Sequence, residues 1–453
     1  MTKLQPVTIP DFGVPLARPA IPAATLAARC DALYAQAGTT WVFVYADREH
    51  NANILFLSGF DPRFEEAALL LGPGGQRIVI TGNESESFTA ISPLPNLRTL
   101  LCQSMSLMAQ DRTRKPSLEA VLRDAGLTRG DTVGVVGWKY LGPEEWDDER
   151  PGFLVPHSMI VILSRVIGGS EGLSDATALL MNPRDGLRSI VDADQIAAFE
   201  WASARSSASV WNVLTRTRPG QREIEAAANL SYAGEPLSAH VMFASGDRHT
   251  RIHGLNSPGG RILSKGDGVT TAVGYWGGLS SRAGLLDDRN DTFAGIAAAY
   301  FDGLVRWYDT ADIGVTGGAL HDAVIAKLAE GGLTPALNPG HLVSYDEWSH
   351  SPVRPGSTDV LRSGMVFQVD VIPTPMPDGA ALNCEDAVAI ADVDLRADLA
   401  ARHPEVWARI EARRAFLRDS LGVTLRESLL PLSNIQLALP PFWLASEMLF
   451  VND

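Results

Sequence analysis

A change in the hydrophobic pattern near residue 170 divides this chain into two parts. Before it, short apolar runs alternate with helical patterns such as the one at residues 23–37. The runs, which predict buried strands, lie at residues 40–45, 67–71, 77–81, 132–138 and 159–163. Strands that alternate with helices are typical of a three-layer α/β domain. The glycine-rich stretch at residues 168–172 is the best candidate for a linker.

The second part begins with a long helix and then changes to short β runs. A helical pattern starts at Asp194 and carries small and apolar residues on one stripe, and a second helix is expected after Pro219. From about residue 240 the sequence consists of short apolar runs between Gly-rich turns. We therefore expect an α/β domain over residues 1–180 and an α+β domain over residues 181–453.

Composition disfavours several classes of partner. A formal net charge of −15 disfavours nucleic acid and anionic membrane surfaces as partners. Cys30, Cys102 and Cys384 lie far apart, which argues against a disulfide framework and a structural zinc site. The first residues lack the apolar core of a secretory signal, and no run of 18 apolar residues occurs. We therefore expect a cytoplasmic protein.

Histidines and acidic residues that are candidates for a functional site occur in about the last two hundred residues. They are His253, His341, His350, Asp370 and Glu385. Asp370 ends the apolar run at residues 365–369, and Glu385 precedes the run at residues 387–390. A carboxyl group between buried strands is costly unless it is paired, so such positions are enriched in functional sites. Two imidazoles and two carboxylates could build either a metal site or an acid–base site.

In their order along the chain, these pieces resemble the catalytic domain of the creatinase, Xaa-Pro aminopeptidase and methionine aminopeptidase family. The family's "GH" histidine matches Gly340-His341, its "L-x-x-G-M" segment matches residues 361–370, and its "R-x-E-D" segment matches residues 383–386. Further matches lie at residues 194–196, 218–225, 246–253 and 350–352, and at residues 53–60 in the N-terminal half. The resemblance implies an α/β N-terminal domain, an α+β pita-bread C-terminal domain and a homodimer.

The departures from the family pattern concern its metal ligands. Metal-dependent relatives carry two bridging aspartates for two metal ions, whereas this chain has Ala272 at the first position and no acidic residue between positions 268 and 286. Asp370 also replaces the family's glutamate. A pair of divalent ions needs several anionic oxygens, and His341, Asp370 and Glu385 could at best hold one ion weakly. Because the pattern is similar to creatinase, the metal-free branch, we expect no metal cofactor.

The leading hypothesis is hydrolysis of a C–N bond in a small nitrogenous or amino-acid-like substrate, as in creatinase. By this resemblance His253 would act as general acid and base, and His341 would bind a substrate carboxylate or orient the water. Glu385 and Asp370 would hold a cationic part of the substrate. Without a metal ion, the rate enhancement must come from positioning and fixed dipoles.

Further residues are expected to bind the substrate. His350 matches the family's "H-E-x-P" histidine, and Arg282 ends a tract that resembles creatinase. Arg63 and Phe64 resemble the N-terminal arm that in creatinase reaches the active site of the neighbouring subunit. Glu347 lies in the same loop as His341 and could replace a lost carboxylate, although a solvated surface acid is the favoured interpretation.

Two alternatives stand beside the leading hypothesis. The first is a metal-dependent Xaa-Pro aminopeptidase or dipeptidase with an altered site, which predicts stoichiometric metal and inhibition by chelators. The second is a catalytically inactive pita-bread protein that binds a peptide or a partner protein, which predicts no hydrolysis of any amide or peptide. Because function resides in the site and not in the fold, the resemblance does not decide among the three.

Overall fold

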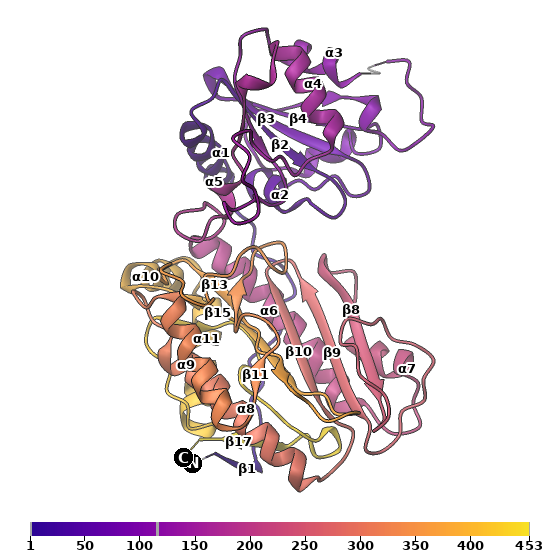
Figure 1. Ribbon diagram of the computed structural model, residues 1–453, viewed down its shortest axis with the longest axis vertical. Helices are drawn as coiled ribbons and strands as arrows, with labels where there is room; N and C mark the ends of the chain where they lie inside the picture. The colour runs from indigo at the N-terminus through magenta and orange to yellow at the C-terminus, as the bar shows by residue number, and fades with distance from the viewer. Residues whose placement is uncertain (1, 115–116, 453) are drawn as a thin grey trace. The chain divides into compact units, whose positions relative to one another are not determined.

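The computed structural model, which describes residues 2–114 and 117–452, forms two compact units (Figure 1). One unit comprises residues 21–188, and the other combines residues 1–20 with residues 189–453. The first residues belong to the second unit because β1 (Lys3–Pro6) pairs with β17 (Met448–Val451) in antiparallel register. The limits expected from the sequence, 1–180 and 181–453, do not include this pairing, which joins segments from the two ends of the chain.

The unit over residues 21–188 is built on a six-stranded mixed sheet in the order β5-β4-β3-β2-β6-β7. The strands are β2 (Trp41–Ala46), β3 (Ala67–Gly72), β4 (Gln76–Thr81), β5 (Leu97–Leu101), β6 (Val133–Val136) and β7 (Leu173–Asp175). β2 and β3 are buried along their whole length, which is why their sequences are continuous apolar runs. Trp41, Phe43 and Tyr45 of β2 join one apolar cluster with the buried sides of α3 (Leu118–Ala125) and α4 (His157–Ile167).

The helices of this unit confirm one expectation and correct another. α1 (Ala23–Ala37) has the bounds that the sequence pattern predicts, and α2 (Ala52–Ser58) and α5 (Ala178–Met181) are shorter. The expectation of a strand at residues 159–163 is wrong, because these residues lie in α4. The buried residues of α4 follow a helical spacing that a window of this length does not distinguish from a buried strand.

The second unit is built on an antiparallel sheet whose main path runs β12-β13-β15-β10-β9-β8, with β16 also paired to β15. Its strands are β8 (Leu237–Gly246), β9 (Gly268–Tyr275), β10 (Gly278–Leu285), β12 (His341–Leu342), β13 (Val366–Val369), β15 (Asn383–Ile390) and β16 (Leu429–Pro431). A separate ladder joins β11 (Thr334–Pro335) to β14 (Pro373–Thr374). Because β12, β13 and β15 are neighbours, residues from three separate segments meet on one part of the sheet.

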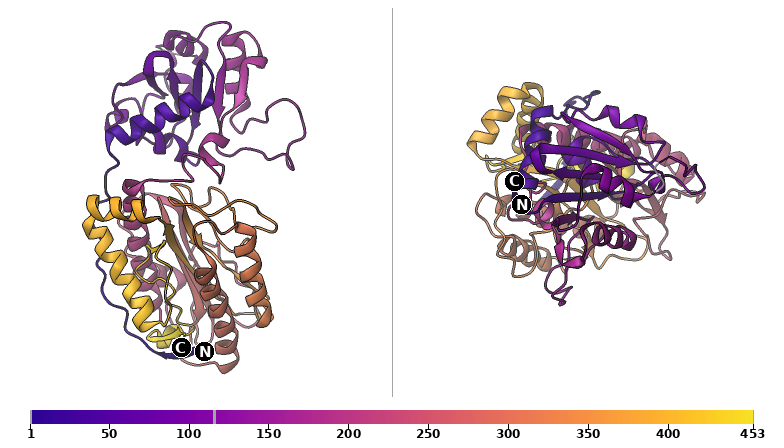
Figure 2. Two further views of the ribbon diagram at one scale, coloured as in Figure 1. Left: turned by 90° about the vertical axis from the view of Figure 1, so that its left-hand side faces the viewer. Right: turned by 90° about the horizontal axis from the view of Figure 1, so that it is seen from above.

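Helices lie on the outside of this sheet (Figure 2). They are α6 (Ala193–Arg216), α7 (Glu223–Ala227), α8 (Asp291–Thr310), α9 (Gly317–Glu330), α10 (Val393–Arg402) and α11 (Pro404–Ser420). α6 begins where the backbone N–H of Gln195 donates to the Asp192 carboxylate, and it lies against β9 and β10. Gly278 permits this approach, because a Cβ there would lie 2.9 Å from the backbone nitrogen of Ser203.

The two faces of the sheet differ in character. Val273 and Tyr275 of β9 join the apolar core together with side chains of α6, so Ala272, directly before Val273, lies on the opposite face. The register pairs Ala272 with Ser281 of β10, and Ser281 with Glu385 of β15. These three residues therefore lie on the same face, which we call the site face.

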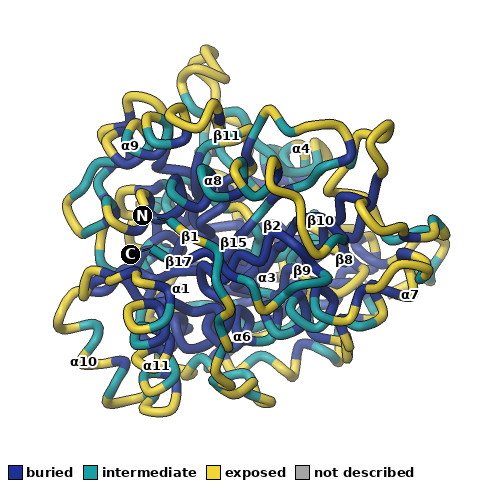
Figure 3. Tube along the Cα trace, turned by 90° about the horizontal axis from the view of Figure 1, so that it is seen from below, coloured by how far each residue is buried: buried dark blue, intermediate teal, exposed yellow. Residues whose placement is uncertain are grey.

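Burial follows this layering (Figure 3). β15, β9 and β10 are buried in the interior, whereas exposed stretches are concentrated in helices and loops. Among the residues that the structure describes, no helix combines the length and the apolar character needed to cross a membrane.

Candidate metal centre

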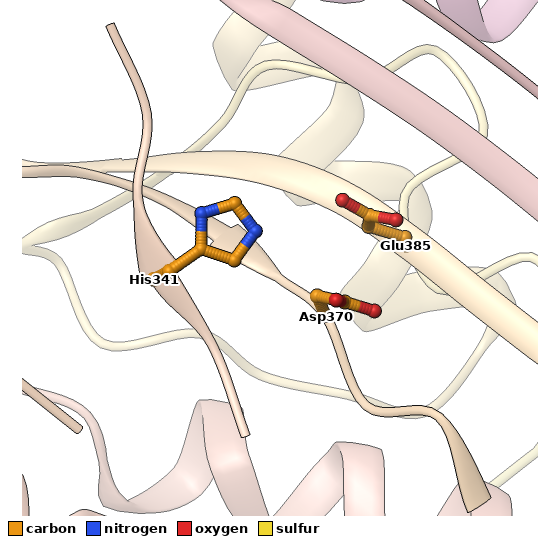
Figure 4. Close-up of side chains that lie close together, drawn as sticks. All are labelled: His341, Asp370 and Glu385. Carbon is orange, nitrogen blue, oxygen red and sulfur yellow. The ribbon is translucent and has the colours of Figure 1, made fainter. Parts of the chain in front are cut away.

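Three side chains from neighbouring strands meet on the site face (Figure 4). His341 lies on β12, Asp370 directly follows β13, and Glu385 lies on β15. Val369 pairs with Asp386, so Asp370 and Glu385 are the next opposed positions. Each member of this triad offers one ligand atom, and the three atoms lie within 4.8 Å of one another. All three residues are buried.

The two carboxyl groups of the triad are buried without sufficient hydrogen-bond donors. Oδ1 of Asp370 and Oε1 of Glu385 have no hydrogen-bond partner among the described residues. Burial raises the pKa of Glu385 well above its ordinary value, and the charge of Asp370 adds to this rise. Burial likewise raises the pKa of Asp370 to about 6, although the nearby His341 opposes the shift. Buried carboxyl groups of this kind need a proton or a cation to neutralise them.

The donor set of the triad suits a divalent cation. One imidazole and two carboxylates are ligands that such ions take in proteins, and two negative charges would balance the charge of one ion. Ligand atoms on opposite sides of an ion, each about 2.1 Å from it, lie roughly 4.2 Å apart. Because the three ligand atoms already lie within 4.8 Å of one another, only small side-chain movements are needed for them to bind one ion. The residues fit a single divalent ion.

The loop that follows His341 holds its imidazole in place. Nδ1 lies 3.3 Å from the carbonyl oxygen of Leu342, and Nε2 lies 3.0 Å from Oε1 of Glu347. The ring of Trp348 stacks on the imidazole, with centroids 4.1 Å apart and planes 17° apart. Burial opposes the charged imidazole, but the Glu347 and Asp370 carboxylates and the carbonyl of Leu342 together outweigh burial and raise the pKa of His341. A proton on Nδ1, bonded to the carbonyl, would leave Nε2 as the ligand atom.

Among the described residues, the row of the site face that continues from Glu385 across β10 and β9 carries no further carboxylate. Ala272 and Ser281 continue the row that starts at Glu385, across β10 and β9. Ala272 packs in a small apolar cluster with Met242 and Leu279. The hydroxyl oxygen of Ser281 accepts a hydrogen bond from the side-chain amide of Asn383 at 3.1 Å. These neutral side chains do not offset the charge of a second divalent ion.

Two of the expected site residues are not part of the triad. His253 is exposed in the segment between β8 and β9 and is not among the ligand atoms that cluster there, so its expected role as general acid and base stays a prediction. Arg282 follows Ser281 on β10 and therefore points to the opposite face of the sheet. There its guanidinium is buried, lies 2.8 Å from Asp386 and donates to the carbonyl oxygen of Ala438. The Arg282 side chain thus lies on the face of the sheet opposite to the triad, and its expected role in binding substrate stays a prediction.

His350 lies at the end of the loop that starts at His341. Its carbonyl oxygen accepts a hydrogen bond from the N–H of Leu342 at 2.7 Å, so the loop returns to β12. Burial lowers the pKa of the His350 imidazole, which favours the neutral ring near pH 7. The structure thus places His350 beside the strand that carries His341.

Arg63 and Phe64 belong to the other unit. Nε of Arg63 lies 3.4 Å from Asp61, and its guanidinium lies over the ring of Phe88 at 4.9 Å. Phe64 is exposed, and both residues line a surface hollow of about 470 Å³ together with Ser87. Their expected role in binding substrate stays a prediction.

Sequence reasoning missed two residues that belong to the site. Gln368 pairs with His341 and lies on the site face, where its amide donates to the carbonyl oxygen of Leu279 at 2.9 Å. Its Oε1 is buried without a hydrogen-bond partner in the described part of the chain. The signal was a polar residue inside an apolar run, two positions before Asp370. Trp348 carries no sequence signal that distinguishes it from other loop tryptophans.

Comparison with known proteins yields structural matches alone. No family model and no curated protein matches the chain. It is similar to a prolidase from Pyrococcus horikoshii, at 18% identity and a TM-score of 0.62 over 81% of this chain and 95% of that one. An Xaa-Pro dipeptidase from Bacillus anthracis matches at 17% identity and a TM-score of 0.61, over 82% and 96%. An X-Pro aminopeptidase from Thermotoga maritima matches at 16% identity and a TM-score of 0.62, over 81% and 95%.

These matches confirm the expected fold and correct the expected cofactor. The chain has the pita-bread fold of prolidases and X-Pro aminopeptidases, with the α/β unit before it in the sequence. The expectation of no metal cofactor is wrong on two grounds. The matched structures belong to the metal-dependent side of the family, and the triad assembles three metal-ligand atoms in one place. The expectation failed because it was drawn from the aspartates that the sequence lacks and took no account of how close the remaining acidic side chains lie.

Proposed function

We propose that this pita-bread chain is a metal-dependent hydrolase that cleaves an amide or peptide bond in a short peptide. The observation that carries the proposal is the buried triad of His341, Asp370 and Glu385, in which two carboxylate oxygens have no hydrogen-bond partner among the described residues. The structural neighbours support the substrate class, since they are named prolidase, Xaa-Pro dipeptidase and X-Pro aminopeptidase.

The triad would hold one divalent ion, with Nε2 of His341 and one oxygen from each carboxylate as ligands. An ion at this position would act as a Lewis acid that polarises a carbonyl group of the substrate. Trp348 and the carbonyl oxygen of Leu342 fix the orientation of the His341 ring. The proposal needs a single ion, because Ala272 and Ser281 add no negative charge to the site face.

Two further residues would contact the substrate. Oε1 of Gln368 is a buried acceptor on the site face, and a substrate N–H could satisfy it. His350 carries an imidazole whose lowered pKa keeps it neutral near pH 7, so it can donate or accept a hydrogen bond. Both residues would orient the scissile bond relative to the triad, and orientation is a large part of the rate enhancement in such sites.

The test is reconstitution of the purified, chelator-treated protein with Mn²⁺, Co²⁺ or Zn²⁺. We expect one ion per chain and hydrolysis of a panel of Xaa-Pro and other dipeptides only after metal is restored. Glu385→Gln should lower both the metal affinity and the turnover by at least about 100-fold, because it removes an ionised ligand. The matched control is Glu330→Gln, which makes the same change on the surface, where Glu330 pairs with Lys327.

Two other outcomes would contradict the proposal. Hydrolysis of a small guanidino substrate by the metal-free protein would favour the creatinase-like hypothesis. Binding of one ion without hydrolysis of any peptide or amide would favour a catalytically inactive binding protein, for which the neutral residues Ala272 and Ser281 are the specific argument. The homodimer and the cytoplasmic location stay predictions, which sedimentation and fractionation test.

A further inference from the structure

We propose that Glu347 is a fourth protein ligand of the ion, so that the centre is a His/Asp/Glu/Glu site with one carboxylate supplied by a loop. This inference rests on the proposed function, since it needs an ion at the triad. It goes beyond the triad because Glu347 comes from the segment between β12 and His350 and not from a strand of the sheet. The loop would thereby supply part of the negative charge that Ala272 and Ser281 do not provide.

The distance between Glu347 and His341 is that of two adjacent ligands. Oε1 of Glu347 lies 3.0 Å from Nε2 of His341. Two atoms that are each about 2.1 Å from one ion and roughly 90° apart around it are separated by about 3.0 Å. This pair therefore already has the spacing that a shared ion requires. The Glu347 oxygens lie outside the group of ligand atoms that are within 4.8 Å of one another, so the side chain must also move toward Asp370 and Glu385 when the ion binds.

The contact between Glu347 and Nε2 of His341 leaves this nitrogen without a full hydrogen bond. Although Oε1 of Glu347 lies 3.0 Å away, Nε2 is buried and has no hydrogen-bond partner among the described side chains and backbone. A buried polar atom of this kind is costly unless it is paired, and a cation held by both side chains would pair it.

The loop limits where Glu347 can go. It is closed at its base by the N–H of Leu342, which donates to the carbonyl oxygen of His350 at 2.7 Å, and by the N–H of Ser349, which donates to the carbonyl oxygen of Leu342 at 3.0 Å. Trp348 stacks on His341 and so fixes the residue next to Glu347. The carboxylate is held beside His341, the member of the triad that it contacts.

Among the three carboxylates of the proposed centre, Glu347 is the one that solvent reaches substantially. Its side chain is 25% exposed, whereas Asp370 and Glu385 are 6% and 5% exposed as residues. An incoming ion can therefore meet this charge before it reaches the buried pair. In this arrangement Glu347 would capture the ion and then remain bound to it.

The experiment compares Glu347→Gln with Asp346→Asn in the full-length, metal-stripped protein. Asp346→Asn removes the same charge from the neighbouring position of the same loop and serves as the matched control. Co²⁺ is titrated into each protein, and both the dissociation constant and the visible absorption of the bound Co²⁺ are recorded. The absorption reports the number and kind of ligands, which a purely structural role of Glu347 would not change.

We expect Glu347→Gln to weaken Co²⁺ binding by about 100-fold or more and to change the Co²⁺ spectrum, since loss of a residue outside the ligand shell costs about 10–100-fold. Asp346→Asn should keep the wild-type spectrum. A Glu347→Gln protein that binds Co²⁺ with the wild-type spectrum would overturn the inference and leave the proposed function intact. If the wild-type protein bound no stoichiometric Co²⁺, both would fall.

Discussion

Replacement of Asp370 by asparagine should stabilise the metal-free protein at pH 7.5, although it removes a ligand. In the folded chain the pKa of Asp370 is about 6, raised from 3.8 by burial, with Glu347 adding to the rise and His341 opposing it. A carboxyl group whose pKa is raised on folding contributes stability below its unfolded pKa and loses that contribution as the pH rises through its folded pKa. The metal-free wild-type protein should therefore lose stability from about pH 4 to beyond pH 6.

The size of the expected change in stability follows from the shift in the pKa of Asp370. A tenfold change in proton affinity is about 1.36 kcal/mol, so a rise from 3.8 to about 6 corresponds to about 3 kcal/mol at pH 7.5. Glu385 shifts in the same direction, and its contribution adds to that of Asp370 in the wild-type protein. The amide side chain of the Asp370→Asn variant has no carboxyl proton to lose, so the part of the loss that comes from Asp370 disappears. The bound ion should reverse the order, because it stabilises only a site with its ligands ionised.

The assay is urea unfolding at pH 5.0 and pH 7.5, with a chelator and then with saturating Mn²⁺. With the chelator, the free energy of unfolding of Asp370→Asn should exceed that of the wild type by up to about 3 kcal/mol at pH 7.5 and by about half as much at pH 5.0. With Mn²⁺ the wild type should gain stability and the variant should gain little. An unfolding free energy for metal-free Asp370→Asn at pH 7.5 that does not exceed the wild-type value would refute the reasoning.

Three further predictions concern the same unit. Arg282→Leu should destabilise the protein by about 3–5 kcal/mol in denaturant unfolding, because it leaves the buried carboxylate of Asp386 without its cationic partner. The Co²⁺ affinity should stay within a few-fold of the wild type, since this pair lies on the face away from the triad, and a loss of affinity equal to that of Glu385→Gln would contradict this placement. Binding of paramagnetic Co²⁺ should quench tryptophan fluorescence, and Trp348→Phe should remove most of that quenching, since Trp348 stacks on His341. Equal quenching in both proteins would show that another tryptophan is the reporter. Metal affinity should rise steeply between pH 5 and pH 7, because burial keeps protons on the carboxyl groups of the triad, and the ion must displace these protons. Isothermal titration at several pH values measures this dependence, and a flat profile would argue against the triad as the ligand set.

Local pattern was sufficient to locate the buried carboxylates. Asp370 follows one apolar run and Glu385 precedes another, and both positions are typical of acids held next to buried strands. The order of the short motifs also predicted the pita-bread fold, which the structural matches confirm. These features depend on residues close in sequence, and so they can be recognised without knowledge of the strand pairing.

The positions of the histidines and of Arg282 relative to the triad depend on strand pairing, which the local sequence does not reveal. His253 and His341 both lie in glycine-containing segments, but β12 pairs with β13 and brings only His341 beside Asp370. Arg282 was assigned to the substrate side from a tract resemblance, and its position on β10 puts it on the opposite face. The metal-free expectation failed in the same way, because counting absent acids along the chain says nothing about how close the remaining ones come.

The sequence by itself therefore determined most of the buried runs and the strands and helices that they form, since these follow from side-chain periodicity over a few residues. Only the tertiary structure decided which face of the sheet carries the site, which histidine joins the acids, and that β1 pairs with β17 at the other end of the chain. The physical reason is that strand order and register are set by contacts between segments far apart in the chain, which the packing of the whole unit selects.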